Sequence, residues 1–241
     1  MKTKHLTPVR TAGRIASAHC VGWLTALLLS LGFAARAQLV IDDFSTGHFE
    51  KQYGSEVLVQ TGDPAHLFGG QRQVAVYDPA NPILPRSSIE LAPGSGKLAY
   101  ERNRAGSLSL GYGYFAGNLV NADLQGPGYD RFEIVVTDAP GPFILAVYVR
   151  DNSFWSRSAS TVISGDGPGR YSVPFSSFSD PAFEWDKFGG FRLSLNISDP
   201  PWNGPGLYGF GGIYAVPEPR HGALVLAAFA LSGALWRRLR R

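Results

Sequence analysis

Two pairs of acidic side chains have a spacing that suits acid–base chemistry. Asp42 and Asp43 are adjacent, and Glu184 lies two residues before Asp186. Two carboxyl groups about 5–9 Å apart can hydrolyse a glycosidic bond, one as the acid and the other as base or nucleophile. Spacing along the chain does not fix that distance, because 19 acidic residues bring some carboxyls together by chance. A glycan-active enzyme therefore stays open as an alternative function.

No other set of residues indicates catalysis, and we predict no catalytic residues. The sequence has no GxSxG, HExxH or complete P-loop motif. His48 and His66 are the only histidines between residues 38 and 219, and we expect both in solvated loops. The single cysteine, Cys20, lies near the N-terminus. We therefore predict neither a metal site nor a cofactor, and we expect the chain not to be an enzyme.

Tryptophans are better candidates for a binding site. Trp155 and Trp185 have polar or charged neighbours, and Trp202 lies in a Pro-Pro-Trp-Asn-Gly-Pro segment typical of a loop. Exposed indole rings stack on the apolar face of a sugar, so these three residues are candidate glycan-binding groups. The alternative is that the rings pack against the edge of the domain.

The elements that position these residues are short strands. The chain has 29 glycines and 17 prolines, which separate runs rich in Val, Ile, Phe and Tyr. In Ser107–Tyr114 and Arg192–Ser198, apolar side chains alternate with polar or small ones, as in half-buried strands. The pattern predicts an all-β fold, a two-sheet antiparallel β-sandwich. Further predicted strands are Leu39–Phe44, Val57–Gln60, Gln73–Tyr77, Lys97–Glu101, Ser156–Ser164, Tyr171–Phe175 and Leu207–Tyr214.

One segment is predicted to be a central strand. Phe143–Val149 is apolar on both faces, which is typical of a strand inside a sheet, with a neighbouring strand on each side. We expect it beside Phe132–Thr137, with Asp138–Pro142 forming the turn of a hairpin.

Charge is distributed unevenly along the chain. Residues 1–37 and 220–241 contain ten basic residues and no acidic one, whereas residues 38–219 contain 12 basic and 19 acidic residues, a net charge of −7. A chain with an acidic body lacks the basic face that nucleic-acid binding needs, so no nucleic-acid partner is expected. About 180 residues between the ends suffice for one domain with its own core.

The N-terminus has the anatomy of a signal peptide, predicted over residues 1–37. A basic stretch precedes an apolar run from Val21 to Phe33, and small residues follow at Ala35 and Ala37. This run is short for a membrane span of about 30 Å. We predict cleavage by signal peptidase between Ala37 and Gln38; an uncleaved membrane anchor is the alternative.

The C-terminus, residues 216–241, combines three features in a fixed order. Val216-Pro217-Glu218-Pro219 precedes an apolar segment, Gly222–Trp236, which as a helix of 15 residues rises about 22 Å. The chain then ends in a cluster of basic residues: Arg237, Arg238, Arg240 and Arg241. Arginines favour the cytoplasmic side of a membrane, which leaves the body on the outer side. The proline triplet should be extended and accessible to a processing enzyme.

This order resembles the PEP-CTERM sorting signal of exported proteins in Gram-negative bacteria. The resemblance implies a short transmembrane helix that holds the chain transiently in the inner membrane. It also implies recognition by an exosortase, removal of the tail near Pro217–Pro219, and delivery to the cell surface or extracellular matrix. The alternative is a plain C-terminal anchor behind a proline-rich linker.

The body, residues 38–215, resembles jelly-roll domains of galactose-binding or carbohydrate-binding-module type. The resemblance rests on Ile41–Phe44, Tyr129–Ile134, Pro174–Phe178 and a closing strand of aromatic residues and glycines. It implies that the first and last strands pair, in some relatives around a structural calcium. The closing segment Gly209–Ile213 brings no acidic residue to Asp42 or Asp43, so no metal is expected.

Together these features predict a secreted or cell-surface protein that is not catalytic. Its β-sandwich is expected to bind extracellular polysaccharide or neighbouring matrix components. Two alternatives stay open: a secreted glycan-active enzyme and a structural matrix component without a defined ligand.

Overall fold

The computed structural model describes residues 38–78, 86–103, 106–113, 120–152, 157–195 and 205–217. The predicted signal peptide, Trp155, Trp202 and the predicted tail from Glu218 onward lie outside these residues. Among the described residues, no helix is both long enough and apolar enough to cross a membrane.

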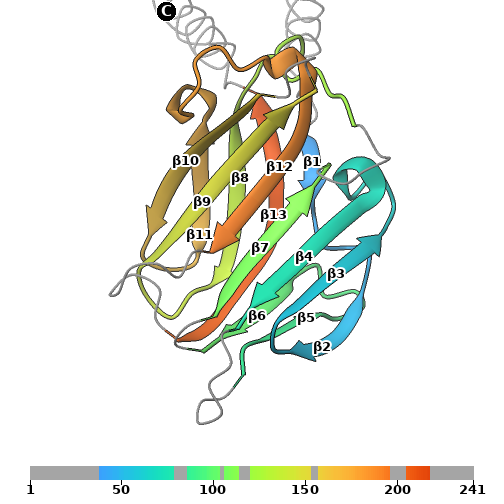
Figure 1. The fold of residues 1–241 in the computed structure, drawn as a ribbon, viewed down its shortest axis with the longest axis vertical. Helices are drawn as coiled ribbons and strands as arrows, with labels where there is room; N and C mark the ends of the chain where they lie inside the picture. The colour runs from blue at the N-terminus through green and yellow to red at the C-terminus, as the bar shows by residue number, and fades with distance from the viewer. Residues whose placement is uncertain are drawn as a thin grey trace, which may run out of the picture. The chain divides into compact units, whose positions relative to one another are not determined.

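The described strands form two antiparallel sheets, which confirms the predicted all-β sandwich (Figure 1). The strand order in the seven-stranded sheet is β11 (Gly169–Pro174), β8 (Tyr129–Asp138), β13 (Gly206–Pro217), β6 (Leu98–Arg102), β5 (Ser88–Leu91) and β2 (Phe49–Tyr53), with β1 (Leu39–Asp42) paired to β13. The order in the six-stranded sheet is β10 (Ser158–Gly165), β9 (Phe143–Asp151), β12 (Phe188–Leu195), β7 (Ser107–Tyr112), β4 (Gln71–Tyr77) and β3 (Glu56–Thr61). Three short 3₁₀ helices lie between strands: η1 (Phe68–Gly70), η2 (Phe175–Ser177) and η3 (Trp185–Lys187).

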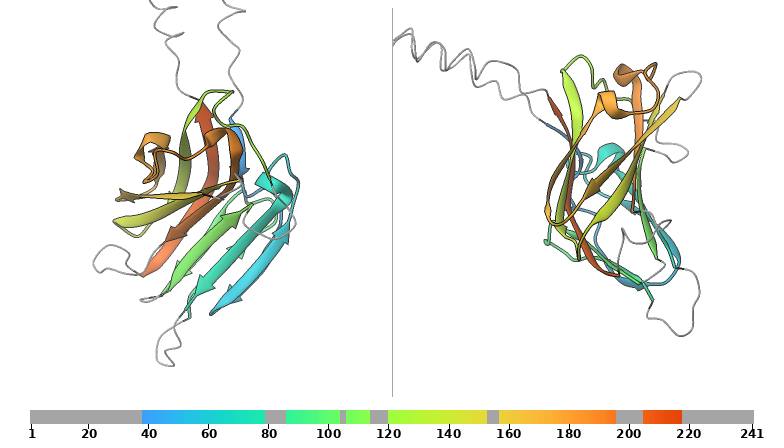
Figure 2. Two further views of the ribbon diagram at one scale, coloured as in Figure 1. Left: turned by 45° about the horizontal axis from the view of Figure 1, so that its top comes forward. Right: turned by 90° about the vertical axis from the view of Figure 1, so that its left-hand side faces the viewer.

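The core lies between the two layers, which Figure 2 shows from the side. Inward positions of β7 and β12 carry the leucines that the alternation predicted, and these are buried. Phe132 on β8 is fully buried at the centre of an aromatic cluster, with its ring centroid 4.9 Å from those of Phe175 and Phe191. Burial of such rings from both sheets is what holds the layers together.

The predicted hairpin between β8 and β9 is wrong. β8 pairs with β11 and β13 in one sheet, whereas β9 pairs with β10 and β12 in the other. Residues 139–142 therefore cross from one layer to the other. The inward side chains of both strands, among them Phe132 and Ile134 of β8 and Leu145 and Val147 of β9, are buried between the two layers. The prediction that Phe143–Val149 is an interior strand is confirmed.

Two strands had no clear sequence signal. β2 (Phe-Glu-Lys-Gln-Tyr) is an edge strand with mostly exposed side chains, and β5 is only four residues long. Neither has enough apolar alternation to be identified by periodicity.

The last strand extends further than predicted. β13 is Gly206–Pro217, whereas the predicted strand was Leu207–Tyr214, so the strand continues three residues beyond its predicted end. Pro217 pairs with Tyr129 at a register shift, and proline is tolerated at such a bulge because no ladder hydrogen bond from its nitrogen is needed. The first and last strands pair, as the resemblance implied: Leu39 lies opposite Ala215.

Candidate functional site

Trp185 is the one predicted glycan-binding tryptophan among the described residues, and it is packed against the core. Its indole stacks on Phe175 with 3.8 Å between ring centroids and an interplanar angle of 5°. Phe183 and Phe178 also contact the ring, at centroid distances of 4.6 and 5.4 Å. Trp185 is only half-buried, but the stacked face is not available to a sugar.

The two acidic pairs have different surroundings. Glu184 binds Lys187 with 2.6 Å between the carboxylate and Nζ, at the start of η3. Asp186 is exposed on the same short helix. Asp42 is fully buried, so its carboxylate cannot reach a polysaccharide in solvent. The structure therefore does not present Asp42 and Asp43 as an accessible acid–base pair.

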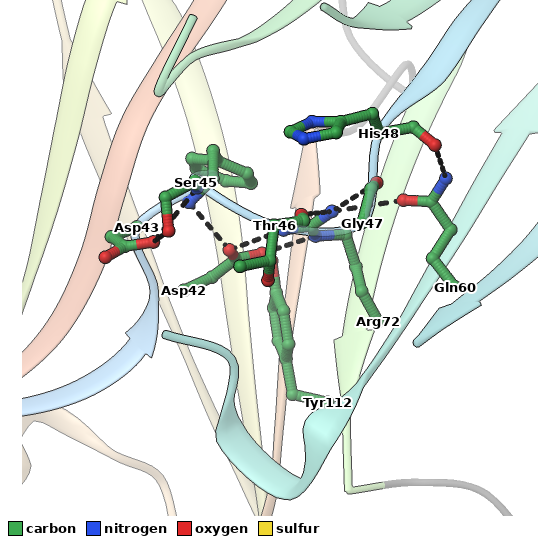
Figure 3. Close-up of polar contacts among 10 residues, drawn as sticks. Asp42, Asp43, Ser45, Thr46, Gly47, His48, Gln60, Arg72 and Tyr112 are labelled. Carbon is green, nitrogen blue, oxygen red and sulfur yellow. Dashed lines mark hydrogen bonds and ion pairs between the residues drawn. The ribbon is translucent and has the colours of Figure 1, made fainter. Parts of the chain in front are cut away.

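Asp42 is instead the centre of a buried polar network that joins the two layers (Figure 3). Its two carboxylate oxygens accept hydrogen bonds from the Arg72 guanidinium, at 2.5 Å from Nε and 2.6 Å from Nη2. The Tyr112 hydroxyl donates to the same carboxylate at 2.8 Å, as does the backbone N–H of Phe44 at 2.8 Å. Asp42 comes from β1 in one sheet, whereas Arg72 on β4 and Tyr112 on β7 are register partners in the other.

Arg72 uses its other N–H groups to hold the loop after β1. Nη1 donates to the carbonyl oxygens of Thr46 and Gly47, at 3.3 Å each, and to Gln60 Oε1 at 3.1 Å. Gln60 in turn donates to the carbonyl of His48 at 3.3 Å. The guanidinium thus fixes residues 46–48 against β3 and β4.

The network has a defined charge state. Burial raises the pKa of Asp42, while the hydrogen bonds and charge of Arg72 act against that rise. Burial alone would lower the pKa of Arg72, but the hydrogen bond and charge of Asp42 raise it. Burial raises the pKa of Tyr112 well above its ordinary value, so the phenol keeps its proton and donates it to the carboxylate. A buried, bidentate ion pair of this kind is a structural element.

Asp43 and His66 form a second, more exposed ion pair beside this network. The Asp43 carboxylate lies 2.6 Å from His66 Nδ1 and accepts hydrogen bonds from the Ser45 hydroxyl and N–H. The hydrogen bond and charge of Asp43 raise the pKa of His66. Both predicted loop histidines are in loops, and His66 has a specific partner there. Among the described residues, no group of three or more His, Cys, Asp or Glu residues has metal-binding geometry.

The outward side of the six-stranded sheet is a candidate binding surface, and we call it the outer face. Its outward positions follow from the register, because cross-strand partners point to the same side. On the four inner strands β9, β12, β7 and β4, these positions alternate with buried residues. One row of outward partners crosses all six strands: Ser160, Tyr148, Arg192, Gly111, Gln73 and Val59. The next row consists of Val162, Ala146, Ser194, Ser109, Ala75 and Val57.

Apolar and polar groups are mixed on this face. Four of the six large apolar side chains that are exposed in the described residues belong to it: Val57, Val59, Tyr77 and Val162. At its centre the Arg192 guanidinium lies over the Tyr148 ring, 4.2 Å from the centroid. The hydroxyls of Ser109 and Ser194 lie 3.2 Å apart between the small residues of the second row.

Sequence reasoning did not identify this face as a site. The signal available was the alternation in Gln71–Tyr77, which places Gln73, Ala75 and Tyr77 on one side of a strand. That alternation did not show which strands lie next to β4, and the neighbours decide which side chains share the surface.

No protein-family model and no curated protein matches the chain. Among solved structures, it is similar to the family 11 carbohydrate-binding module from Clostridium thermocellum in complex with a β-1,3-1,4-mixed-linked tetrasaccharide, with 11% identity, a TM-score of 0.39, and coverage of 75% of this chain and 95% of that chain. It is also similar to the family 30 carbohydrate-binding module of the cellulosomal cellulase Cel9D-Cel44B of Clostridium thermocellum, with 14% identity, a TM-score of 0.41, and coverage of 76% and 99%.

Proposed function

We propose that this chain is an exported, non-catalytic protein of the cell surface or extracellular matrix, and that it binds polysaccharide on the outer face of its six-stranded sheet. The observation that carries the proposal is the concentration of exposed apolar side chains among hydroxyl, amide and guanidinium groups on that face. Sugars present apolar C–H faces and rings of hydroxyls, so a mixed surface of this kind is complementary to them.

The size and openness of the outer face fit a polymer better than a small molecule. Six strands at a spacing of about 4.8 Å give a surface roughly 24 Å across. The central positions are small, namely Gly111, Ser109, Ser194 and Ala75, so a chain lying across the strands meets little steric hindrance. Tyr77 provides an aromatic side chain that is 58% exposed at one end of the face.

Export is the second part of the proposal and rests on the two ends of the chain. Signal peptidase would cleave after Ala37, and an exosortase would remove the tail near Pro217–Pro219 after transient insertion in the inner membrane. The net charge of −7 in residues 38–219, with no cysteine, is compatible with a body that functions outside the cytoplasm.

Polysaccharide binding is tested with the full-length chain, purified in a non-ionic detergent without a sugar headgroup, on a glycan array and by calorimetry. Tyr77→Ala should weaken binding about tenfold, the effect of removing one aromatic contact. The matched control is Tyr53→Ala, because Tyr53 is 56% exposed but lies on β2 of the other sheet. Equal losses in both variants, or no binding by the wild type, would contradict the proposal.

Sorting is tested by mass spectrometry of the mature protein from its native host. The expected mature chain begins at Gln38 and ends near Pro217–Pro219. A mature chain that retains Arg240 and Arg241 would refute exosortase processing.

The same preparations distinguish the two alternatives. Hydrolysis of a labelled polysaccharide, lost in Glu184→Gln or Asp186→Asn, would show a glycan-active enzyme. A processed protein without affinity for any polysaccharide would be a structural matrix component.

A further inference from the structure

The two sheets of the sandwich carry their charges in different ways. The outward side of the seven-stranded sheet and its margins contain acidic residues in ion pairs: Lys51–Glu101 and Arg170–Glu133, each at 2.9 Å, and Lys97–Asp138. In the described strands of the six-stranded sheet, no outward position carries Asp or Glu. The two acidic residues of those strands, Glu56 and Asp151, are register partners of the inward-facing Val76 and Phe188. Among the described strand residues, acidic charge is therefore absent from the outer face.

The outer face instead carries two arginines on adjacent strands. Arg192 on β12 lies opposite Tyr148 on β9, and Arg150 on β9 lies opposite Gly190 on β12. The two arginines are thus diagonal neighbours on one side of an antiparallel pair, a relation that places Cα atoms roughly 7–8 Å apart.

Both guanidinium groups are held in place. Arg192 lies over the Tyr148 ring, and Nη2 of Arg150 donates to the carbonyl of Gly113 at 3.3 Å. Glycines at positions 111 and 190 occupy the adjacent outward positions, so no side chain there blocks approach to the arginines. Preorganised guanidinium groups lose less side-chain entropy when they bind a carboxylate.

We infer that the polysaccharide is anionic, a polymer with carboxylates on its sugar residues, and that Arg150 and Arg192 bind those carboxylates. This inference rests on the proposed function and specifies its ligand. A body with a net charge of −7 repels a polyanion, and the repulsion is weakest over a surface without acidic residues. The described strands of the outer face provide such a surface. The arginine guanidinium group matches a planar carboxylate well, because it can donate two parallel hydrogen bonds to the two carboxylate oxygens.

The test uses the full-length chain in the same detergent and three polymers: alginate, polygalacturonate and hyaluronate. Each polymer is compared with its carboxyl-reduced form, which keeps the backbone and linkages and replaces every carboxylate by a hydroxymethyl group. Calorimetry at 0.15 M salt should show binding to at least one acidic polymer and at least tenfold weaker binding to its reduced form. Arg192→Gln and Arg150→Gln should each weaken binding of the acidic polymer about tenfold, the effect of losing one charge-assisted contact.

Two control variants keep the test specific. Arg170→Gln removes the same charge from the outward side of the other sheet and should leave the affinity unchanged. Arg192→Lys retains the charge and should bind more tightly than Arg192→Gln, and the thermal unfolding of all variants shows whether they are folded.

The remaining outcomes overturn the inference in distinguishable ways. Equal binding of acidic and reduced polymers, sensitive to Tyr77→Ala but not to Arg192→Gln, would leave the proposed function standing and refute the anionic ligand. An equal loss in Arg170→Gln would show attraction by net charge alone. Absence of binding to either form by the wild type would refute both proposals, and self-association abolished by Arg192→Gln would identify a second copy of the chain as the occupant.

Discussion

Replacing Arg72 with methionine should destabilise the protein strongly, because it removes the only cation that directly contacts the Asp42 carboxylate among the described residues. Asp42 is fully buried and would be left with only Tyr112 and the Phe44 N–H as donors. Methionine keeps most of the apolar stem and its packing beside Phe44, where the guanidinium carbon lies 5.1 Å from the ring centroid. The expected loss therefore reports on the charge and its hydrogen bonds.

The magnitude follows from the proton that Asp42 would have to take up. Protonating a carboxyl group with an ordinary pKa of 3.8 at pH 7 costs about 4 kcal/mol, since one pKa unit corresponds to about 1.4 kcal/mol. This agrees with the roughly 3–5 kcal/mol lost when one partner of a buried pair is removed. Because the cost lies in protonation, it should fall by about 1.4 kcal/mol for each unit that the pH is lowered from 7 toward 5.

Urea unfolding of the wild type and of Arg72→Met at pH 5, 6 and 7 measures this dependence. Adding Asp42→Asn to the variant should abolish the pH dependence, because no buried carboxyl remains to be protonated. A loss below about 1 kcal/mol that does not change with pH would refute the reasoning, since it would mean that Asp42 is solvated or neutral in the wild type.

Three further predictions concern separate parts of the structure. The hydrogen bond and charge of Asp43 raise the pKa of His66 in the folded state. The ion pair therefore stabilises the protein fully at pH values below about 6.5, the pKa of histidine in the unfolded chain. That stabilisation is lost as the pH rises through the raised pKa of folded His66. The stability difference between wild type and His66→Gln should therefore shrink between pH 6 and pH 9 in thermal unfolding, and a constant difference would exclude the pair. Phe132→Ala should lower the free energy of unfolding by about 3–5 kcal/mol in urea, because Phe132 is fully buried in the aromatic cluster; a loss under 1 kcal/mol would show that the cluster is loosely packed. Gly113→Ala should lower the melting temperature by several degrees, because Gly113 has φ = +70° and an added Cβ would lie 2.2 Å from the carbonyl oxygen of Gly189; an unchanged melting temperature would argue against that close approach.

The alternation of apolar and polar residues predicted most of the strands, because successive side chains of a half-buried strand point alternately to the core and to solvent. Ser107–Tyr114 and Arg192–Ser198 were found in this way, and the leucines of both segments that the structure describes are buried. The same reasoning failed at β2, an edge strand in which three of five side chains are exposed and the exposed positions do not alternate. It also failed for the connection from β8 to β9, because short turn sequences are alike whether the chain folds back in one sheet or crosses to the other.

The candidate site was less predictable than the fold. Trp185 was selected for its charged neighbours, but four phenylalanines pack around its ring: Phe132 of β8, and Phe175, Phe178 and Phe183. The sequence does not show that Asp42 contacts Arg72, because 30 residues separate them and only the packing of β1 against β4 brings them together. The outer face likewise depends on the strand order β10-β9-β12-β7-β4-β3. This order brings together strands that are far apart in the sequence, from β3, which begins at Glu56, to β12, which ends at Leu195.

The sequence by itself determined the character of three segments of the chain. The body is acidic, free of cysteine and rich in strands, and the two ends are basic and contain apolar runs. These properties depend on residue type and short-range periodicity, which are fixed before folding. The tertiary structure decided which residues are neighbours, and so placed Asp42 in a buried ion pair and Trp185 against the core. It also placed Arg150 and Arg192 on a face whose described strands carry no outward carboxylate. Such contacts arise from strand order and register, and these are set by the burial of side chains from the whole domain at once.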